Sequence, residues 1–218
     1  VRVRFSLRPP KIMNLDNLNN LIELFSHQVQ KQNKKDIFLQ WLNPNNQKTY
    51  TWEETQKNIL KLSKIIKENI KEGDRCLLVS ENRPEWFVSD LAIMLSDGIT
   101  VPAYTTYTEE DYKYLIEDCE PSLVIVSNNE LLKKLSKTID EKDFIKKVIT
   151  LDEVSKVTDN LNLITKEKYL GFNSITKIDL LEKDKIQNDK LKRTSPACII
   201  YTSGTAVSYT HLTLPTSY

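Results

Sequence analysis

The sequence predicts an α/β fold in which a parallel sheet is covered by helices on both faces. Two observations lead to this prediction: short, continuous apolar stretches recur along the chain, and amphipathic stretches with helical spacing separate them. Strands that are apolar at every position suit a sheet that is buried on both faces. The 218 residues, of which 39% are hydrophobic and 28% charged, suffice for such a core.

The first part of the chain predicts two helices with a pair of short strands between them. The expected elements are a helix over residues 17–31 and strands over residues 37–42 and 48–51, around the turn sequence Asn-Pro-Asn-Asn-Gln. Thr51 and Glu54 have the spacing of a capping box, so we expect the second helix to begin there and to end at Gly73. His27 lies off the apolar stripe of the first helix and is expected to be a solvated surface residue.

The middle of the chain repeats a strand–helix alternation that is typical of βαβ units. Pro84 suits the first turn of a helix, and Thr108 is a suitable N-cap for the next one. The expected strands cover residues 76–79, 99–103, 123–126 and 148–151, and the expected helices cover residues 84–95, 108–118 and 129–135.

Residues 152–194 are rich in Lys, Asp and Asn and show weaker periodicity, so we expect a surface excursion with one helix near residues 175–182. The chain is then expected to re-enter the core as an apolar strand over residues 196–201.

Composition excludes several classes of protein. The 31 Lys and Arg residues are balanced by 30 Asp and Glu residues, and the net charge of +1 argues against a strongly basic nucleic-acid binder. The longest apolar run, residues 91–95, is far shorter than the ~20 residues of a transmembrane helix. The four glycines are too widely spaced for either of the common glycine-rich nucleotide-binding motifs.

The cysteines and histidines offer little for metal or disulfide chemistry. Cys76, Cys119 and Cys198 are widely spaced and form no Cys-x-x-Cys motif, so we interpret them as buried, reduced cysteines of a cytoplasmic protein. The two histidines are too few for most zinc sites or histidine-based triads.

Both ends of the chain differ from the middle. Residues 1–12 hold four basic residues and no acidic one, and we interpret Met13 as the natural start. Val207–Thr216 back-translates without mismatch to GTC TCT TAT ACA CAT CTG ACG CTG CCG ACG, which resembles a transposon-end sequencing adapter. The expected organisation is therefore a non-native leader (1–12), one incomplete domain (13–206) and an adapter-derived tail (207–218).

A run of small polar residues follows the last apolar stretch: Thr202, Ser203, Gly204 and Thr205. Ligands of α/β folds bind at the carboxyl ends of parallel strands. Successive backbone N–H groups of small residues can converge on an anion there, and the hydroxyls add further donors. The run predicts a phosphate-binding loop; taken alone, it is also compatible with an ordinary tight turn.

Three segments carry a family resemblance. The sequence IIYTSGT at 199–205 resembles the start of the signature YTSGTTGxPKG of the acyl-adenylate-forming superfamily. GDRCLLVSENRPEW at 73–86 and the segment at 98–127 are similar to the N-terminal region of AMP-forming long-chain fatty acyl-CoA synthetases, as is TYTWEE at 49–54. The resemblance covers most of residues 13–205 and implies the N-terminal part of such an enzyme.

The resemblance implies a ligase that uses ATP, Mg²⁺ and CoA and acts on a fatty acid in two steps. A carboxylate and ATP give an acyl-adenylate and pyrophosphate, and the CoA thiol then displaces AMP. Residues Thr202 to Thr205 would contact the ATP phosphates, with Tyr201 packed under them. No nucleic-acid partner or transmembrane segment is implied, and peripheral membrane contact of the longer enzyme is compatible with it.

Two further segments follow predicted strands. By resemblance, the turn of Tyr104, Thr105, Thr106 and Tyr107 would line the CoA tunnel; it can equally be a surface turn before the Thr108 cap. Glu81, Asn82 and Arg83 follow the strand at 76–79, and we expect a structural role in which Asn82 and Arg83 brace the helix that begins at Pro84.

The chain departs from the family pattern after Thr205. Where the signature continues Thr-Gly-x-Pro-Lys-Gly, this sequence has Ala206-Val207-Ser208-Tyr209. No catalytic residue or metal ligand is therefore assigned, and we expect this chain by itself to be inactive. Two alternatives stay open: another adenylating enzyme, such as an aryl-CoA ligase or a peptide-synthetase domain, and a non-catalytic α/β binding module without an exposed apolar edge.

Overall fold

Five parallel strands form the centre of the molecule in the computed structural model, which describes residues 18–43, 46–153 and 168–202. Their order in the sheet is β4-β3-β5-β6-β7, and their bounds are β3 Arg75–Val79, β4 Ile99–Ala103, β5 Leu123–Val126, β6 Lys147–Thr150 and β7 Tyr169–Gly171. Every pair of neighbours is parallel. The predicted α/β fold with a parallel sheet is confirmed. The leader, the tail and Ser203 to Thr205 lie outside the described residues.

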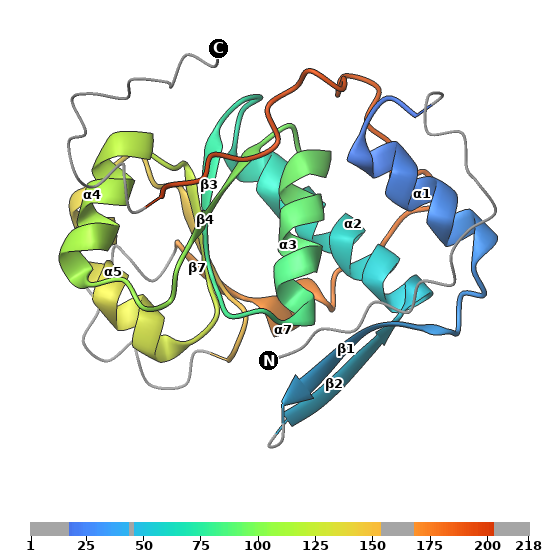
Figure 1. Ribbon diagram of the computed structural model, residues 1–218, viewed down its shortest axis with the longest axis horizontal. Coiled ribbons are helices and arrows are strands. Elements are labelled where there is room, and N and C mark those ends of the chain that lie inside the picture. The colour runs from blue at the N-terminus through green and yellow to red at the C-terminus, as the bar shows by residue number, and fades with distance from the viewer. Residues whose placement is uncertain (1–17, 44–45, 154–167, 203–218) are drawn as a thin grey trace, which may run out of the picture.

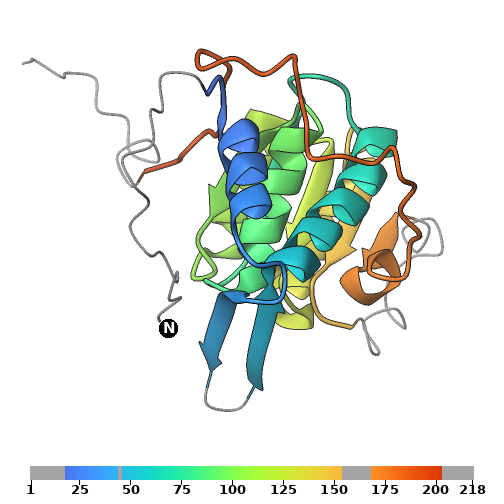
Figure 2. The same cartoon turned by 90° about the vertical axis from the view of Figure 1, so that its right-hand side faces the viewer.

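Helices cover both faces of this sheet (Figure 1). The helices on one face are α1 Leu21–Lys31, α2 Trp52–Asn69 and α3 Pro84–Leu95, and those on the other are α4 Glu109–Cys119 and α5 Asn129–Glu141. A separate antiparallel hairpin, β1 Ile37–Asn43 and β2 Asn46–Thr51, extends away from the body (Figure 2). The predicted pair of strands around the Asn-Pro turn is this hairpin.

Alternation along the strands divides the core into two clusters. In β3, Cys76 and Leu78 pack toward α1, α2 and α3, whereas Leu77 and Val79 pack toward α4 and α5. All four side chains are fully buried. Successive side chains of a strand point to opposite faces, so a strand that is apolar at every position requires a helical layer on each side.

Capping boxes fix the starts of two helices. The backbone N–H of Glu54 donates to the Thr51 hydroxyl at 3.2 Å, and the Glu54 carboxylate accepts from the Thr51 N–H at 2.8 Å, as predicted. Thr108 and Asp111 form a second box at the start of α4, with the same two distances at 3.2 and 2.9 Å. Each box satisfies two backbone donors that would otherwise lack a partner at the helix start.

The chain after residue 150 differs from its prediction. A short strand, β7, pairs with β6, and the helix lies at Phe172–Ile175 (α7) rather than near residues 175–182. A strand of three residues is too short to show a hydrophobic period. Helix α5 is also longer than expected and continues to Glu141.

The expected strand over residues 196–201 is not formed. This segment pairs with the edge strand β4 at a single parallel bridge between Thr100 and Cys198, with the N–H of Ile199 donating to the Thr100 carbonyl at 2.9 Å. Cys198 is exposed, contrary to prediction, and Ile199 and Ile200 are 38% and 64% exposed. The segment lies outside the edge strand, so only one of its sides has a partner in the described part of the chain.

Two smaller predictions concern single side chains. Cys76 and Cys119 are buried, as expected. His27 is half-buried rather than solvated, and its buried Nδ1 has no hydrogen-bond partner among the described residues. Although His27 lies off the apolar stripe of α1, other parts of the chain thus partly bury its side chain.

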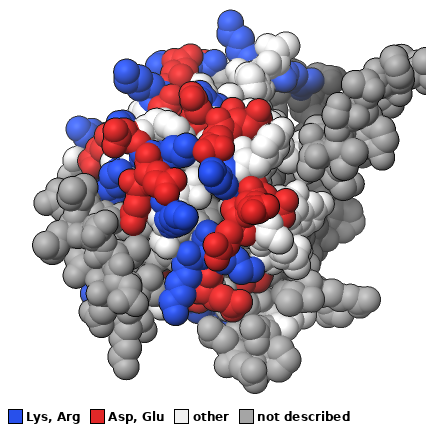
Figure 3. All heavy atoms as spheres, turned by 90° about the vertical axis from the view of Figure 1, so that its left-hand side faces the viewer, with Lys and Arg blue, Asp and Glu red and all other residues white. Residues whose placement is uncertain are grey.

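The face over α4 and α5 carries interspersed positive and negative side chains (Figure 3). Surface pairs such as Lys142 with Glu117, at 2.8 Å, belong to this mixture. A mixed face of this kind does not create the single-sign field that attracts a polyanion such as nucleic acid.

We predict that Gly98→Ala destabilises the fold. A Cβ at this position would lie 2.8 Å from Ile70 Cδ1 and 3.0 Å from Ile93 Cγ2, so neighbouring side chains must move. Overpacking of this kind costs about 1–3 kcal/mol of unfolding free energy, which urea unfolding monitored by circular dichroism would measure. Gly171→Ala is the matched control, because its Cβ would lie 3.9 Å from the Thr150 hydroxyl and should leave stability nearly unchanged. Equal midpoints for the two variants would contradict the prediction.

Candidate functional site

A pocket of about 350 Å³ lies at the carboxyl ends of β3 and β4. It is the place where a parallel α/β sheet normally binds its ligand. Three separate segments line it: Ser80, Glu81, Asn82 and Trp86 after β3; Pro102, Ala103, Tyr104 and Thr105 at the end of β4; and Ile200 and Tyr201. The fold therefore brings the start of the Tyr104 turn beside the residue that precedes the predicted phosphate loop.

Helix α4 holds the Tyr104 turn in place. The hydroxyl of the fully buried Tyr112 donates to the Tyr104 carbonyl at 2.7 Å. The ring of Tyr107 stands at steep angles to those of Tyr104 and Tyr112, at centroid distances of 5.4 and 5.9 Å. Tyr104 itself is 65% exposed. Tyr104 and Thr105 line the pocket, whereas Thr106 and Tyr107 are not among its lining residues.

The same helix anchors Tyr201. The Tyr201 hydroxyl donates a hydrogen bond to the Asp118 carboxylate, and its ring stands perpendicular to that of Tyr114 at a centroid distance of 6.4 Å. Burial and the hydrogen bond to Asp118 raise the pKa of Tyr201, so the hydroxyl stays protonated and remains a donor. Thr202 follows and is exposed. The phosphate role of Thr202 to Thr205 stays a prediction.

Glu81 is held by the loop after β5. The amide nitrogen of Asn128 donates to Glu81 Oε1 at 3.0 Å and to the Ser127 hydroxyl at 3.2 Å. Asn128 is itself fixed, because its side-chain oxygen caps α5 by accepting from the Leu131 N–H at 3.0 Å. Asn82, in contrast, is exposed, and no hydrogen bond of its side chain is found among the described residues. Its predicted bracing role is therefore not supported.

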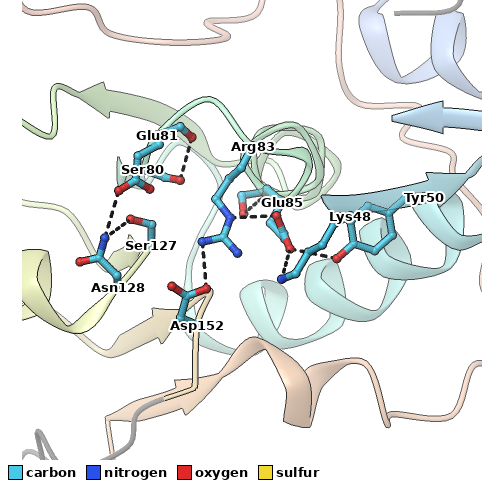
Figure 4. Close-up of polar contacts among 10 residues, drawn as sticks. Lys48, Tyr50, Ser80, Glu81, Arg83, Glu85, Ser127, Asn128 and Asp152 are labelled. Carbon is cyan, nitrogen blue, oxygen red and sulfur yellow. Dashed lines mark hydrogen bonds and ion pairs between the residues drawn. The ribbon is translucent and has the colours of Figure 1, made fainter. Parts of the chain in front are cut away.

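Arg83 does brace the start of α3, through a buried ion-pair network (Figure 4). Its Nε donates to Glu85 Oε2 at 2.9 Å, and its Nη1 lies 3.0 Å from Asp152 Oδ1, after β6. The guanidinium also lies over the Trp41 ring, 4.8 Å from the centroid. Arg83 and Glu85 are almost fully buried. The network thus connects the ends of two strands to the first turn of α3.

Two residues of the hairpin complete the network. Lys48 Nζ and the Tyr50 hydroxyl both donate to Glu85 Oε1, at 3.1 and 2.9 Å. Burial and the negative charge of Glu85 raise the pKa of Tyr50, which therefore stays a donor. Glu85, Lys48, Tyr50 and Asp152 were not singled out from the sequence. Lys48 and Tyr50 are two residues apart on a strand and therefore lie on the same face, and this spacing was the signal in the sequence that could have grouped them.

The acidity of Glu85 reflects its partners. Burial alone would raise the pKa of this carboxyl group, but the hydrogen bond and charge of Arg83, together with the charge of Lys48, bring it down to about 2. The carboxylate is thus ionised across the physiological range, and its four lone-pair directions are largely used by donors. We interpret this network as structural.

The chemistry of the pocket differs from that of the network. Among the described residues that line it, none is Lys, Arg or His, and Glu81 is the one carboxylate. The described residues contain no group of three or more His, Cys, Asp or Glu side chains that could hold a metal ion. The pocket therefore offers aromatic residues, an amide, several hydroxyls and one negative charge.

Comparison with a family model and with known proteins identifies relatives of this chain. The family model described as "AMP-binding enzyme" matches residues 25–206. A long-chain-fatty-acid–CoA ligase (ACSBG2) of Xenopus laevis is 27% identical over 57% of this chain and 16% of its own length. Long chain acyl-CoA synthetase 3 of Arabidopsis thaliana is 27% identical over 71% of this chain and 23% of its own length. The chain thus spans less than a quarter of these relatives.

Solved structures show the same fold. The anthranilate CoA ligase AuaEII in complex with anthranoyl-AMP superposes with a TM-score of 0.68 at 17% identity, over 88% of this chain and 34% of the ligase. A benzoate CoA ligase from Burkholderia xenovorans LB400 gives 0.59 at 14% identity, over 77% of this chain and 30% of its own. In the described part of the chain, no helix is both long and apolar enough to cross a membrane.

We predict that Glu85→Gln destabilises the protein at pH 7 and that the difference from wild type shrinks in acid. Removal of one partner of a buried pair typically costs about 3–5 kcal/mol. The folded-state pKa of Glu85, about 2, lies below the usual 4.5. The stabilisation is therefore complete above about pH 4.5 and is lost as the pH falls through 2. Urea unfolding at a series of pH values would measure this difference.

Glu53→Gln is the control for this prediction, because it removes one carboxylate from an exposed i,i+4 pair with Lys57 and should change stability little. A stability difference between Glu85→Gln and wild type that stays constant down to pH 2 would show that the carboxylate charge is not responsible.

Proposed function

Since the chain belongs to the family of AMP-binding enzymes, we propose that it forms the N-terminal part of an ATP-dependent fatty acid–CoA ligase. Such an enzyme joins a carboxylate to ATP, releases pyrophosphate, and then transfers the acyl group from AMP to the CoA thiol. The long-chain substrate class is supported by the names of the relatives and by the Ser-Glu-Asn-Arg-Pro-Glu-Trp sequence after β3. Cytoplasmic location stays a prediction.

One observation carries this proposal: Tyr104, Thr105 and Tyr201 line the same pocket at the carboxyl edge of the sheet. The sequence resemblance assigned the Tyr104 turn to CoA and the residues after Tyr201 to the ATP phosphates. A transfer between acyl-adenylate and thiol requires the two ligands to approach each other, because proximity is a large part of catalysis. The start of the Tyr104 turn and Tyr201 line the same pocket, so their arrangement meets that requirement.

The described residues would contribute to the reaction by positioning hydrogen-bond donors toward the substrates. A phosphoryl or adenylyl transfer depends on donors aimed at the oxygens that gain charge. Thr202, and by resemblance Ser203, Gly204 and Thr205, would supply hydroxyl and backbone donors. Mg²⁺ would neutralise charge on the triphosphate, but the described residues include no metal-binding cluster, so we derive no step through it. The 218-residue chain itself is expected to bind ATP weakly and to form no acyl-adenylate.

The two alternatives differ in how well they fit. A non-catalytic module was expected to have no exposed apolar edge, yet Ile199 and Ile200 are exposed beside the edge strand β4. This observation counts against the module. An aryl-CoA ligase stays a second candidate, since the solved structures of that kind share the fold and the acyl pocket would decide between the two.

The proposal predicts fatty-acid-dependent exchange of pyrophosphate into ATP by a full-length enzyme that carries this N-terminal part with the complete signature. The 218-residue chain, assayed alongside, should give no exchange above a blank without enzyme. A full-length protein that exchanges pyrophosphate with benzoate or anthranilate, and not with fatty acids, would favour the aryl-CoA ligase. Exchange by the short chain would contradict its expected inactivity.

A second prediction concerns Thr205 in that full-length enzyme. Thr205→Ala should lower the adenylation rate by about 10²–10³-fold if its donor acts on developing charge, by analogy with oxyanion-hole donors. The preference among fatty acids should stay the same, because loss of a phosphate contact affects all substrates equally. Rates of acyl-adenylate formation with acids of several chain lengths would test this. A changed preference at an unchanged best rate would contradict the phosphate role.

A further inference from the structure

The pocket at the carboxyl edge combines aromatic walls with one negative charge. Trp86, Tyr104 and Tyr201 contribute rings, and Glu81 contributes the carboxylate. None of the lining residues is basic. Arg83, the cation nearest in sequence, is buried and directed to Glu85 and Asp152 instead (Figure 4). The negative charge at the pocket therefore has no balancing cation among the lining residues.

Glu81 is held in place while keeping one oxygen unused. Oε1 accepts from Asn128, whose own position is fixed by its cap on α5. Oε2 has no hydrogen-bond partner among the described residues, and Glu81 forms no ion pair with any of them. A half-buried carboxylate with one free oxygen, fixed from behind, presents a directed acceptor to whatever enters the pocket.

We infer that Glu81 makes this pocket selective for uncharged groups that carry an N–H or O–H donor, and unfavourable for phosphate. Like charges repel, and no basic side chain among the described lining residues offsets that repulsion. A donor, in contrast, would form a charge-assisted hydrogen bond with Oε2 while its apolar body lies against the rings. The inference is about a specificity-determining residue, and it rests on the proposed function for its choice of substrates.

Two substrate parts in the proposed reaction have the required chemistry. The pantetheine arm of CoA is slender, uncharged and rich in amide N–H groups, and the adenine ring of ATP is flat and carries an amino group. The triphosphate, in contrast, is negatively charged and has no apolar body that could lie against the rings. Thr202, the first residue of the predicted phosphate loop, is not among the residues that line the pocket.

Trp86 provides a probe in the 218-residue chain itself, since it is one of the residues that line the pocket. We expect saturable quenching of Trp86 fluorescence by pantetheine or by adenosine, and none by inorganic tripolyphosphate at equal concentration and ionic strength. Quenching by pantetheine would identify CoA as the source of the donor, and quenching by adenosine would identify ATP. Trp86→Phe should abolish the signal, which separates it from the buried Trp41 and Trp52.

Glu81→Gln removes the charge and retains an oxygen for the Asn128 bond. It should weaken binding of the uncharged ligand about tenfold or more, since a hydrogen bond to a charged group is worth more than one to a neutral amide. Glu130→Gln is the matched control: it removes the same charge from an exposed position on α5 close to Asn128 and should bind like wild type. Glu81→Lys should gain quenching by tripolyphosphate.

Three results would overturn the inference: quenching of the wild-type chain by tripolyphosphate as strong as by the uncharged ligands, no quenching by any of the three, or equal affinities for Glu81→Gln and Glu130→Gln. Circular dichroism of each variant would establish that it is folded. These binding results are independent of pyrophosphate exchange. Failure of exchange in the full-length enzyme would therefore contradict the proposed function. The charge selectivity of the pocket would still be decided by the quenching experiments alone.

Discussion

The buried pair of Arg83 and Glu85 is the interaction on which the arrangement of the other parts depends. Through Lys48 and Tyr50 it fastens the hairpin, and through Asp152 it fastens the loop after β6. The hairpin and the loop after β6 therefore both contact the start of α3, which follows the carboxyl end of β3. Buried charges are costly unless every one of them is paired. The network therefore ties the hairpin and the loop after β6 to the first turn of α3, next in sequence to residues that line the pocket.

Charge is divided between two neighbouring places at this edge. The network neutralises its carboxylates with Arg83 and Lys48. Glu81, only two residues away from Arg83, has no cation as a partner in the part of the chain that the structure describes. The difference arises because alternate residues after β3 point in different directions. One short segment thus supplies both a structural anchor and a directed acceptor, which is typical of residues at the end of a parallel strand.

Most of the sheet and its helical layers could be predicted from the sequence, because β3, β5 and the helices around them have strong and local patterns. The capping box of Thr51 was predicted for the same reason, whereas the bracing role of Arg83 was inferred only from its position before Pro84. Two features at the edges of the sheet could not be predicted: β7 is too short to show a period, and the apolar residues 197–201 look like a core strand although they lie outside β4. The network was missed because Lys48, Glu85 and Asp152 meet only in the folded chain, and Asn82 was assigned a bracing role on proximity in sequence alone.

Helix α4 touches both sides of the pocket, through the Tyr112 bond to the Tyr104 carbonyl and through the Asp118 bond to Tyr201. The distance between these two pocket segments is thus set by one rigid element and not by the long stretch of chain that joins them. For the same reason, a chimaera that exchanges the Tyr104 turn between related enzymes should carry α4 with it as a single cassette.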